Sequence, residues 1–193
     1  MSDTFRRGFK TEASDIAREV RAELRLRHAD RLDPLLLAEH LGIPVIPLSE
    51  YGSDAPQACA EFSGGEMFAF SAVTVFRGKR RIIVHNDYQP LGRQSNNIVH
   101  EASHGLLHHP PTPALDARGC RDWSKDIEDE ASWLAGVLLI PEEAALFIAS
   151  EGLSEDAAAE RFGVSVQLVR WRMNMTGAHK RIARRRAAYA RGR

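Results

Sequence analysis

The sequence has no long apolar run and few cysteines, and both absences narrow its class. No stretch approaches the roughly 20 consecutive apolar residues that cross a bilayer, so we expect no membrane span. The charged residues 1–10 lead into no apolar segment, which argues against a signal peptide and favours a cytoplasmic protein. Cys59 and Cys120 are far apart and form no Cys-x-x-Cys pair, which predicts reduced structural thiols rather than a disulfide.

The chain has no net charge, because 26 basic and 26 acidic residues cancel. Near the C-terminus, however, acidic and basic residues are concentrated in different segments. Residues 122–160 carry eleven acids and one base, whereas residues 161–193 carry ten bases and no acid. One interpretation is that the two segments are solvated faces that partly compensate each other. The alternative is a basic tail for DNA or for an acidic partner.

At 193 residues, 44% of them hydrophobic, the chain can bury the core of one medium domain with a small appendage. We place the domain at residues 1–150 and the appendage at residues 151–193.

The residues from Asn97 to His109 form an apolar helical run with a His-Glu-x-x-His pattern at its centre. His100 and His104 are four residues apart, so one helix face brings both imidazoles within reach of one tetrahedral ion. Glu101 follows the first histidine, where a carboxylate can reach a metal-bound water without ligating the metal. The pattern therefore indicates a catalytic zinc site.

The next histidines are poor candidates for a third ligand. His108 would lie roughly 12 Å from His100 along a continuous helix. The extended metzincin pattern would need glycine and histidine where Leu107 and Pro110 stand. We therefore predict that His108 and His109 are surface or helix-end residues.

A predicted helix over residues 126–140 offers two acids for the third position. Its apolar face includes Ala131, Leu134 and Leu138, and Glu128 and Glu130 flank that face on opposite sides. Periodicity alone cannot choose between these two glutamates. Without a metal motif upstream, both would be ordinary acids near a helix N-terminus.

Helices are also expected over residues 11–27 and 33–42, and the central helix should begin near Ser95 or Asn96 and stop at Pro110–Pro111. We also expect an antiparallel meander of about three strands, at residues 60–62, 67–76 and 81–85. Residues 43–47 should form an extended segment at a sheet edge or outside the sheet. An edge strand beside the metal helix could pair with an extended peptide.

Residues 154–173 resemble a helix-turn-helix, with a tight turn at Gly163 and a second helix capped by Ser165. Gln167, Arg170 and Arg172 would lie on that second helix. The alternative, which we favour over DNA contact, is a small helical pair that packs on the enzyme or docks its substrate. From residue 180 onward we expect a solvated helix end or a frayed tail.

The run Ile-Glu-Asp-Glu-Ala-Ser-Trp-Leu-Ala-Gly-Val-Leu-Leu-Ile-Pro at residues 127–141 resembles a helix of the ImmA/IrrE zinc metallopeptidases, which likewise follows a His-Glu-x-x-His helix. By this resemblance His100, His104 and Glu128 bind Zn²⁺, and Glu101 is the catalytic carboxylate. Ser132 stands where the family has Asn or Asp, and Leu134 where Phe is usual. The serine could lose a hydrogen bond that tunes the metal site.

The expected fold is α+β: a zincin-like metallopeptidase with a small antiparallel sheet packed on helices, plus the helix-turn-helix-like segment. The expected function is a zinc endopeptidase of the gluzincin type, and the resemblance implies a helix-turn-helix transcriptional repressor as its substrate, cleaved to switch on a stress-response or mobile-element programme. The alternative is a non-proteolytic regulator that binds DNA or a repressor and has a structural or degenerate metal site. The sequence identifies no residue that stabilises the oxyanion; Tyr88 and His85 are only near the helix in sequence.

Overall fold

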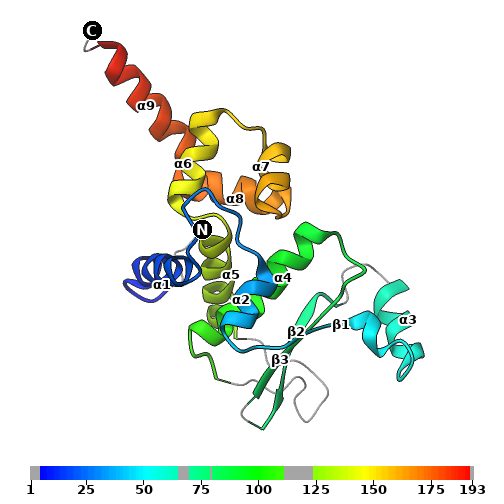
Figure 1. The fold of residues 1–193 in the computed structure, drawn as a ribbon. Coiled ribbons are helices and arrows are strands. Elements are labelled where there is room, and N and C mark those ends of the chain that lie inside the picture. Colours follow the sequence, from blue (N-terminus) through cyan, green and yellow to red (C-terminus); the bar gives the residue numbers. More distant parts are fainter. Residues whose placement is uncertain (1–4, 65–69, 79, 111–123, 192–193) are drawn as a thin grey trace.

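The computed structural model describes residues 5–64, 70–78, 80–110 and 124–191. These form an α+β fold made mostly of helices, with one small sheet at one end and the C-terminal helices at the other (Figure 1). The elements are α1 Phe9–Glu23, α2 Pro34–His40, β1 Val45–Pro47, the 3₁₀ helix η1 Leu48–Tyr51, α3 Pro56–Gly64, β2 Ala72–Arg77, β3 Arg80–His85, α4 Leu91–Leu106, α5 Lys125–Leu139, α6 Glu142–Glu151, α7 Glu155–Phe162, α8 Val166–Thr176 and α9 Ala178–Arg191.

The sheet is mixed, with the strand order β1-β3-β2. β2 pairs antiparallel with β3, opposing Thr74 to Ile83, whereas β1 pairs parallel with β3, opposing Val45 to Ile83. The prediction of an antiparallel meander was therefore wrong for one strand. Residues 60–62 belong to α3, which begins at Pro56, a residue favoured in the first turn of a helix. The third strand comes instead from the proline-flanked segment expected at a sheet edge.

Helix α4 also differs from its predicted bounds, because it begins at Leu91, directly after Pro90, and ends at Leu106. The extra first turn depends on Gly92: a Cβ there would lie 2.5 Å from the carbonyl oxygen of Val164, so only glycine fits against that backbone. The helix stops before the proline at 110, because His108 takes up a left-handed conformation with φ 53°. Pro111 lies outside the described residues.

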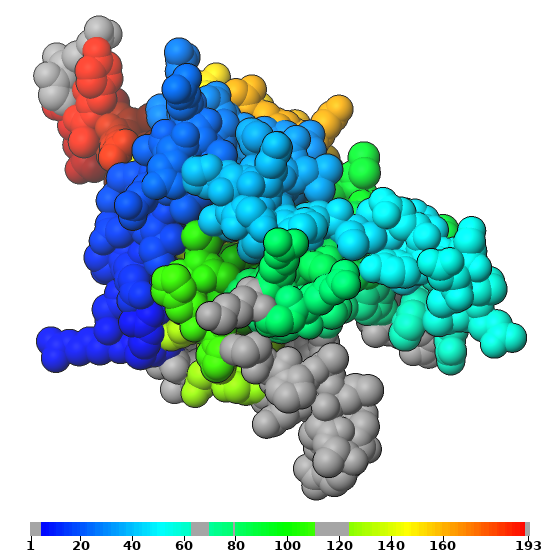
Figure 2. All heavy atoms as spheres, turned by 60° about the horizontal axis from the view of Figure 1, so that its bottom comes forward, coloured from blue at the N-terminus to red at the C-terminus, as the bar shows by residue number. Residues whose placement is uncertain are grey.

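The hydrophobic core lies between the helices that carry the motif residues. α4 packs on α5 and on one face of the sheet, while α1 covers α5. In Figure 2, α1 (blue) and α3 (cyan) occupy opposite sides of the molecule. Fully buried side chains at the centre include Phe9, Leu37, Ile83, Val99, Leu134 and Leu138. Burial of Val99 and Ala102 fixes the rotation of α4, so that His100 and His104 face α5.

The C-terminal helices pack closely on this core. The ring of Trp171 on α8 lies where a Cβ on Gly136 of α5 would stand, only 2.3 Å from that point, so the two helices approach closely. Arg172 is buried and donates from Nε to the carbonyl of Ile140 at 2.8 Å. The boundary between residues 150 and 151 remains a prediction.

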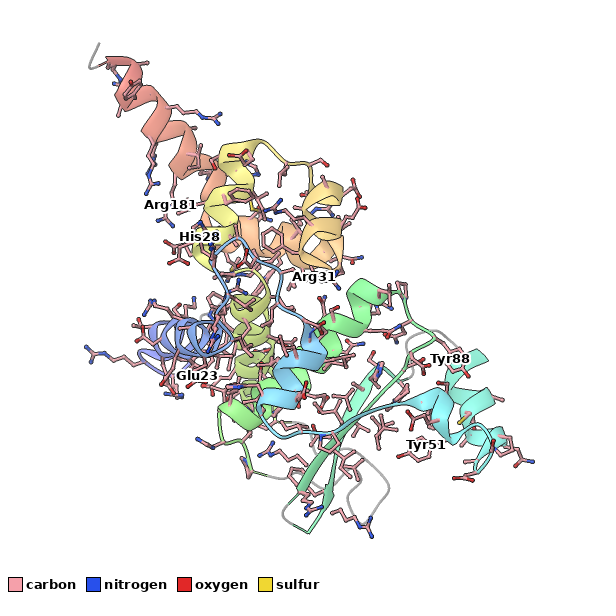
Figure 3. All side chains as sticks on the ribbon, viewed as in Figure 1. Glu23, His28, Arg31, Tyr51, Tyr88 and Arg181 are labelled. Carbon is pink, nitrogen blue, oxygen red and sulfur yellow. The ribbon has the colours of Figure 1, made fainter. Side chains whose placement is uncertain are left out.

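Helices α7 and α8 meet at Gly163, as the sequence predicts, and Ser165 caps α8 by accepting a hydrogen bond from the Leu168 amide. Gly163 has φ 64° and lies against the guanidinium of Arg31, so a side chain there would meet both strain and a close neighbour (Figure 3). The segment predicted as a helix end or frayed tail continues as helix α9 to Arg191 and projects from the body (Figure 1).

Among the described residues, none of the helices alone has the length and apolar character to cross a bilayer; by those two criteria only, the pair α5 and α6, bent by 50° at their junction, passes together. Cys59 is buried as a free thiol that donates to the carbonyl of Leu48. Cys120 lies outside the described residues.

Candidate metal centre

Two helices bring three metal-ligating side chains together. His100 and His104 project from α4, and Glu128 projects from the first turn of α5. The Nε2 atoms of the two histidines are 3.2 Å apart, and Glu128 Oε2 is 3.1 Å from His100 Nε2. Glu128 Oε1 is 3.6 Å from His104 Nε2. One ligand atom from each residue lies within 4.8 Å of the other two, which is close enough for all three to bind one ion.

The chemistry of this donor set fits zinc. Two imidazole nitrogens and a carboxylate oxygen are ligands that Zn²⁺ accepts, and three protein ligands leave a fourth tetrahedral position for water or substrate. The spacing also suits one ion, because nitrogen ligands about 2.0–2.1 Å from a tetrahedral zinc lie roughly 3.3 Å from each other. The two Nε2 atoms are 3.2 Å apart.

Glu128 is held in its charged form by its neighbours. Partial burial raises the pKa of the Glu128 carboxyl, but the hydrogen bonds and positive charge of His100 and His104 lower it by more, so the pKa lies well below its ordinary value. The Glu128 side chain is therefore deprotonated at neutral pH. A ligand carboxylate needs this charge.

Glu101 is the residue after His100 on α4, and its side chain is oriented by the sheet. The hydroxyl of Thr74 on β2 donates a hydrogen bond of 2.6 Å to Glu101 Oε2. Thr74 belongs to β2, one of the two edge strands of the described sheet, directly opposite Ile83 of β3. This contact leaves the Oε1 atom of Glu101 to accept or release a proton.

Glu130 does not join His100 and His104, although the sequence left it as an alternative to Glu128. Its Oε2 lies 3.4 Å from Nε2 of His109, and its Oε1 lies 3.1 Å from Nε of Arg6. The two glutamates thus contact different histidines, which periodicity along α5 could not reveal. Which histidine each glutamate contacts depends on how α5 packs against α4 and against the turn after it.

The prediction for His109 needs a correction. His109 follows the helix end, but it is only 8% exposed, because the chain turns at His108 and folds the ring back under α4. Its Nδ1 lies 2.9 Å from Nδ1 of His104. Burial and the charge on His104 lower the pKa of His109, while Glu130 opposes them. His108 is exposed, as predicted.

Ser132 still contacts the site despite departing from the residue expected by resemblance. Its hydroxyl lies 3.3 Å from Nδ1 of His100, the ring nitrogen opposite the one that faces Glu128. The serine therefore offers His100 a polar neighbour of the kind that orients a ligating imidazole. Sequence reasoning missed Thr74, because the apolar neighbours of this residue favour an outward threonine, whereas Thr74 bonds Glu101 and Val75 is exposed. It also misplaced His109, for which a second histidine after the motif was the available signal.

The remaining candidates lie elsewhere. Tyr88 is 56% exposed and lies on the α3 side of the molecule (Figure 3). His85 is buried at the end of β3, and its Nδ1 has no hydrogen-bond partner among the described residues. Neither residue has a described contact with His100, His104 or Glu128.

Charged residues of the C-terminal helices contact the acidic segment before them. Arg170 donates to Glu155 at 2.7 Å, and Arg181 pairs with Glu142 at 2.8 Å (Figure 3). For these residues the compensating interpretation of the charge pattern is confirmed. Of the three side chains proposed for a DNA-reading helix, Arg172 is buried, Arg170 is paired and Gln167 is exposed.

A comparison with protein families matches most of the chain. Residues 38–174 match the IrrE N-terminal-like domain of peptidase family M78, which is a family of metallopeptidases. The chain belongs to this family, and the resemblance seen in the sequence is confirmed.

Comparison with solved structures gives a Mycobacterium tuberculosis transcriptional regulator at 14% sequence identity and a TM-score of 0.46, covering 86% of this chain and 46% of the regulator. The chain thus spans less than half the length of that protein. Comparison with curated proteins gives no match.

Proposed function

We propose that the chain is a zinc-dependent endopeptidase in which His100, His104 and Glu128 bind Zn²⁺ and Glu101 is the catalytic carboxylate. The observation that carries this proposal is the convergence of two α4 imidazoles and one α5 carboxylate. Glu101, the residue after His100, is not one of the three and is held by Thr74. A purely structural zinc site has no need for that fourth side chain. The two histidines and a glutamate from a following helix are the ligand set of a gluzincin.

His100, His104 and Glu128 would hold the zinc ion, which would supply Lewis acidity toward water and toward the substrate carbonyl. Glu101 takes a proton from the attacking water while the water oxygen forms a bond to the carbonyl carbon. Glu101 then gives this proton to the amide nitrogen as the carbon–nitrogen bond breaks. Thr74 holds one carboxylate oxygen throughout, so the other remains directed at the reacting groups.

The substrate class that we propose is a helix-turn-helix transcriptional repressor, as the family resemblance implies. β2 lies at the edge of the described sheet and contacts α4, so an extended peptide could add to this edge next to Glu101. Main-chain hydrogen bonds would align the substrate with little demand on its side chains. Cleavage of a repressor would then release the genes that it controls.

Replacement of Glu101 by Gln tests this function. The Glu101→Gln variant should retain one zinc per chain and lose cleavage of a repressor encoded by a neighbouring reading frame, measured by gel electrophoresis and mass spectrometry of the fragments. Glu39→Gln, an exposed change on α2, is the matched control. Cleavage by Glu101→Gln at the parental rate would show that the enzymatic assignment is wrong.

The alternative function, a regulator that binds DNA without proteolysis, has less support. Three side chains of α8 would contact DNA bases in this alternative. Arg172 is buried and Arg170 is paired with Glu155, so two of the three are not available for such contacts. Helix α7 also places Glu155 and Asp156 at the same surface, where they would repel phosphates. A salt-dependent mobility shift of duplex DNA by the full chain would favour this alternative.

A further inference from the structure

A line of polar contacts leads away from the proposed metal ligands into the protein. His104 is joined through its Nδ1 to Nδ1 of His109 at 2.9 Å, and His109 Nε2 lies 3.4 Å from Glu130 Oε2. Glu130 Oε1 in turn contacts Nε of Arg6 at 3.1 Å. These residues come from α4, the turn after it, α5 and the segment before α1. Four separate parts of the chain therefore meet along one line.

The proton positions along this line follow from elementary hydrogen-bond rules. If His104 binds a metal through Nε2, that nitrogen carries no proton, and a neutral ring then carries its proton on Nδ1. The Nδ1 of His104 must therefore donate to Nδ1 of His109. His109 accepts at Nδ1, so its own proton lies on Nε2 and is directed at the Glu130 carboxylate. Every atom on the line then has a partner of the correct kind.

Several contacts surround the ring of His109 at the far end of this line. The His109 and Glu130 side chains are 9% and 14% exposed, and the backbone carbonyl of His109 accepts a hydrogen bond of 3.1 Å from Arg81. Arg6 is itself fixed by two hydrogen bonds to Glu12, at 2.6 and 2.8 Å. The carboxylate is thus oriented from behind, and the imidazole is held on both of its nitrogens and on its backbone.

We propose that His109 is a positioning residue that holds His104 as the Nδ1–H tautomer, with Glu130 and Arg6 as its support, so that Nε2 of His104 is directed at the metal. This inference rests on the proposed function, because it concerns the zinc ligand named there. It also assigns Glu130 a role different from that of Glu128. Hydrogen-bond partners of a ligating histidine of this kind typically change metal affinity by about 10–100-fold when they are removed.

Three variants separate this role from simple packing. His109→Phe keeps a ring in the buried position but removes the acceptor. His109→Asn places its side-chain oxygen near the position of Nδ1 and so retains an acceptor for His104. His108→Asn is the matched control, because it removes the adjacent exposed imidazole and asparagine tolerates the left-handed backbone there.

Zinc affinity is measured by competition with a chromophoric chelator, and Co²⁺ is substituted to record the visible absorption of the site. We expect His109→Phe to weaken zinc binding about 10–100-fold and to shift the Co²⁺ bands, and His109→Asn to recover most of the affinity. His108→Asn should match the parent. Circular dichroism and thermal unfolding of the metal-free variants show whether each one folds.

A measurement on the unsubstituted protein covers the case in which His109→Phe does not fold. Long-range ¹H–¹⁵N spectra of the zinc-loaded, ¹⁵N-histidine-labelled chain should show His104 protonated on Nδ1 and His109 protonated on Nε2. A proton on Nδ1 of His109 would overturn the proposal. So would parental zinc affinity in a folded His109→Phe variant, or a His109→Asn variant no better than His109→Phe.

These outcomes are distinct from failure of the proposed function. If the parent protein binds no zinc at all, the metallopeptidase proposal fails, and the inference fails with it. If the parent binds zinc and cleaves its substrate while His109→Phe behaves as the parent, only the role of His109 is wrong.

Discussion

Thr74 on β2 and Glu101 on α4 are joined by a hydrogen bond of 2.6 Å, although 27 residues separate them in the sequence. The bond ties the proposed catalytic carboxylate to the edge strand of the sheet. The strand that we propose to bind the substrate therefore also orients the group that would act on it. Small displacements of β2 would be transmitted directly to Glu101.

Replacement of Thr74 by Val removes this hydrogen bond and keeps the shape of the side chain. Loss of the bond should let the Glu101 carboxylate leave its position, so kcat for repressor cleavage should fall roughly tenfold or more while zinc content stays at the parental level. Thr74→Ser keeps the hydroxyl and is the control. Equal rates for Thr74→Val and the parent would mean that the bond has no part in catalysis.

Removal of each α5 glutamate in turn distinguishes ligand from support. Glu128→Ala should lose stoichiometric zinc, measured by atomic absorption after gel filtration, because it takes away one of three protein ligands. Glu130→Ala should still bind one zinc per chain, but with lower affinity, because it leaves His109 without its carboxylate partner. The reverse result would make Glu130 the third ligand.

Zinc should also raise the melting temperature of the parent protein, because a ligand that binds only the folded state stabilises it by mass action. The rise should be absent in Glu128→Ala under the same zinc concentration. A similar rise in that variant would place the bound metal somewhere other than the three residues described.

Two glycines of α4 should respond in opposite ways to replacement by alanine. Gly92→Ala would press a Cβ against the Val164 carbonyl, 2.5 Å away, and should lower the free energy of unfolding by about 1–3 kcal/mol. Gly105→Ala meets Ile43 at an ordinary 3.5 Å and should raise it by about 0.5–1 kcal/mol, because alanine is the better helix former. Urea unfolding of both variants measures the difference. A tolerated Gly92→Ala would contradict the close approach of α4 to the α7–α8 turn.

Protonation of His85 should lower the stability of the folded protein in mild acid. Burial lowers the pKa of His85 below its ordinary value of 6.5, with Asp87 opposing the shift. The folded state therefore prefers the neutral ring, so this contribution to stability is complete above about pH 6.5 and is lost as the pH falls toward the lowered folded-state pKa. His85→Phe, which cannot be protonated, should lose less stability than the parent between pH 7.5 and 5.5. Thermal unfolding in chelator measures both slopes without the metal, and equal slopes would argue against the prediction.

The sequence contained the local elements of the site but not their mutual placement. The His-Glu-x-x-His spacing and the capped helix α2, with Asp33 accepting from two amides, follow from rules that operate within one or two turns. Glu128 was singled out by family resemblance, since periodicity left it equal to Glu130. What distinguishes them is the docking of α5 on α4, which brings Glu128 to His100 and Glu130 to His109. Such long-range packing is not encoded in any short window.

The errors have related causes. Residues 60–62 were predicted as a strand because the neighbouring sequence is rich in strand formers, whereas the helix from Pro56 continues through them. The parallel pairing of β1 with β3 joins segments that α3 and β2 separate in the sequence, so no local sequence pattern predicts it. His109 was set aside together with His108, whose distance from His100 was judged along an ideal helix. The helix ends at Leu106, and the backbone reversal at His108 returns the His109 ring to His104.

Glu128 and Glu130 are two positions apart on α5, so their side chains leave the helix roughly 200° apart around its axis. One directs its carboxylate to His100 and His104, and the other to His109. The rotation of α5 about its own axis therefore determines both contacts. A small rotation of the helix would break the contacts of Glu128 and of Glu130 together. Bound zinc would therefore prevent rotation of α5 about its axis. Trp171 and Arg172 pack at the C-terminal end of α5, so metal binding should also restrain the C-terminal helices.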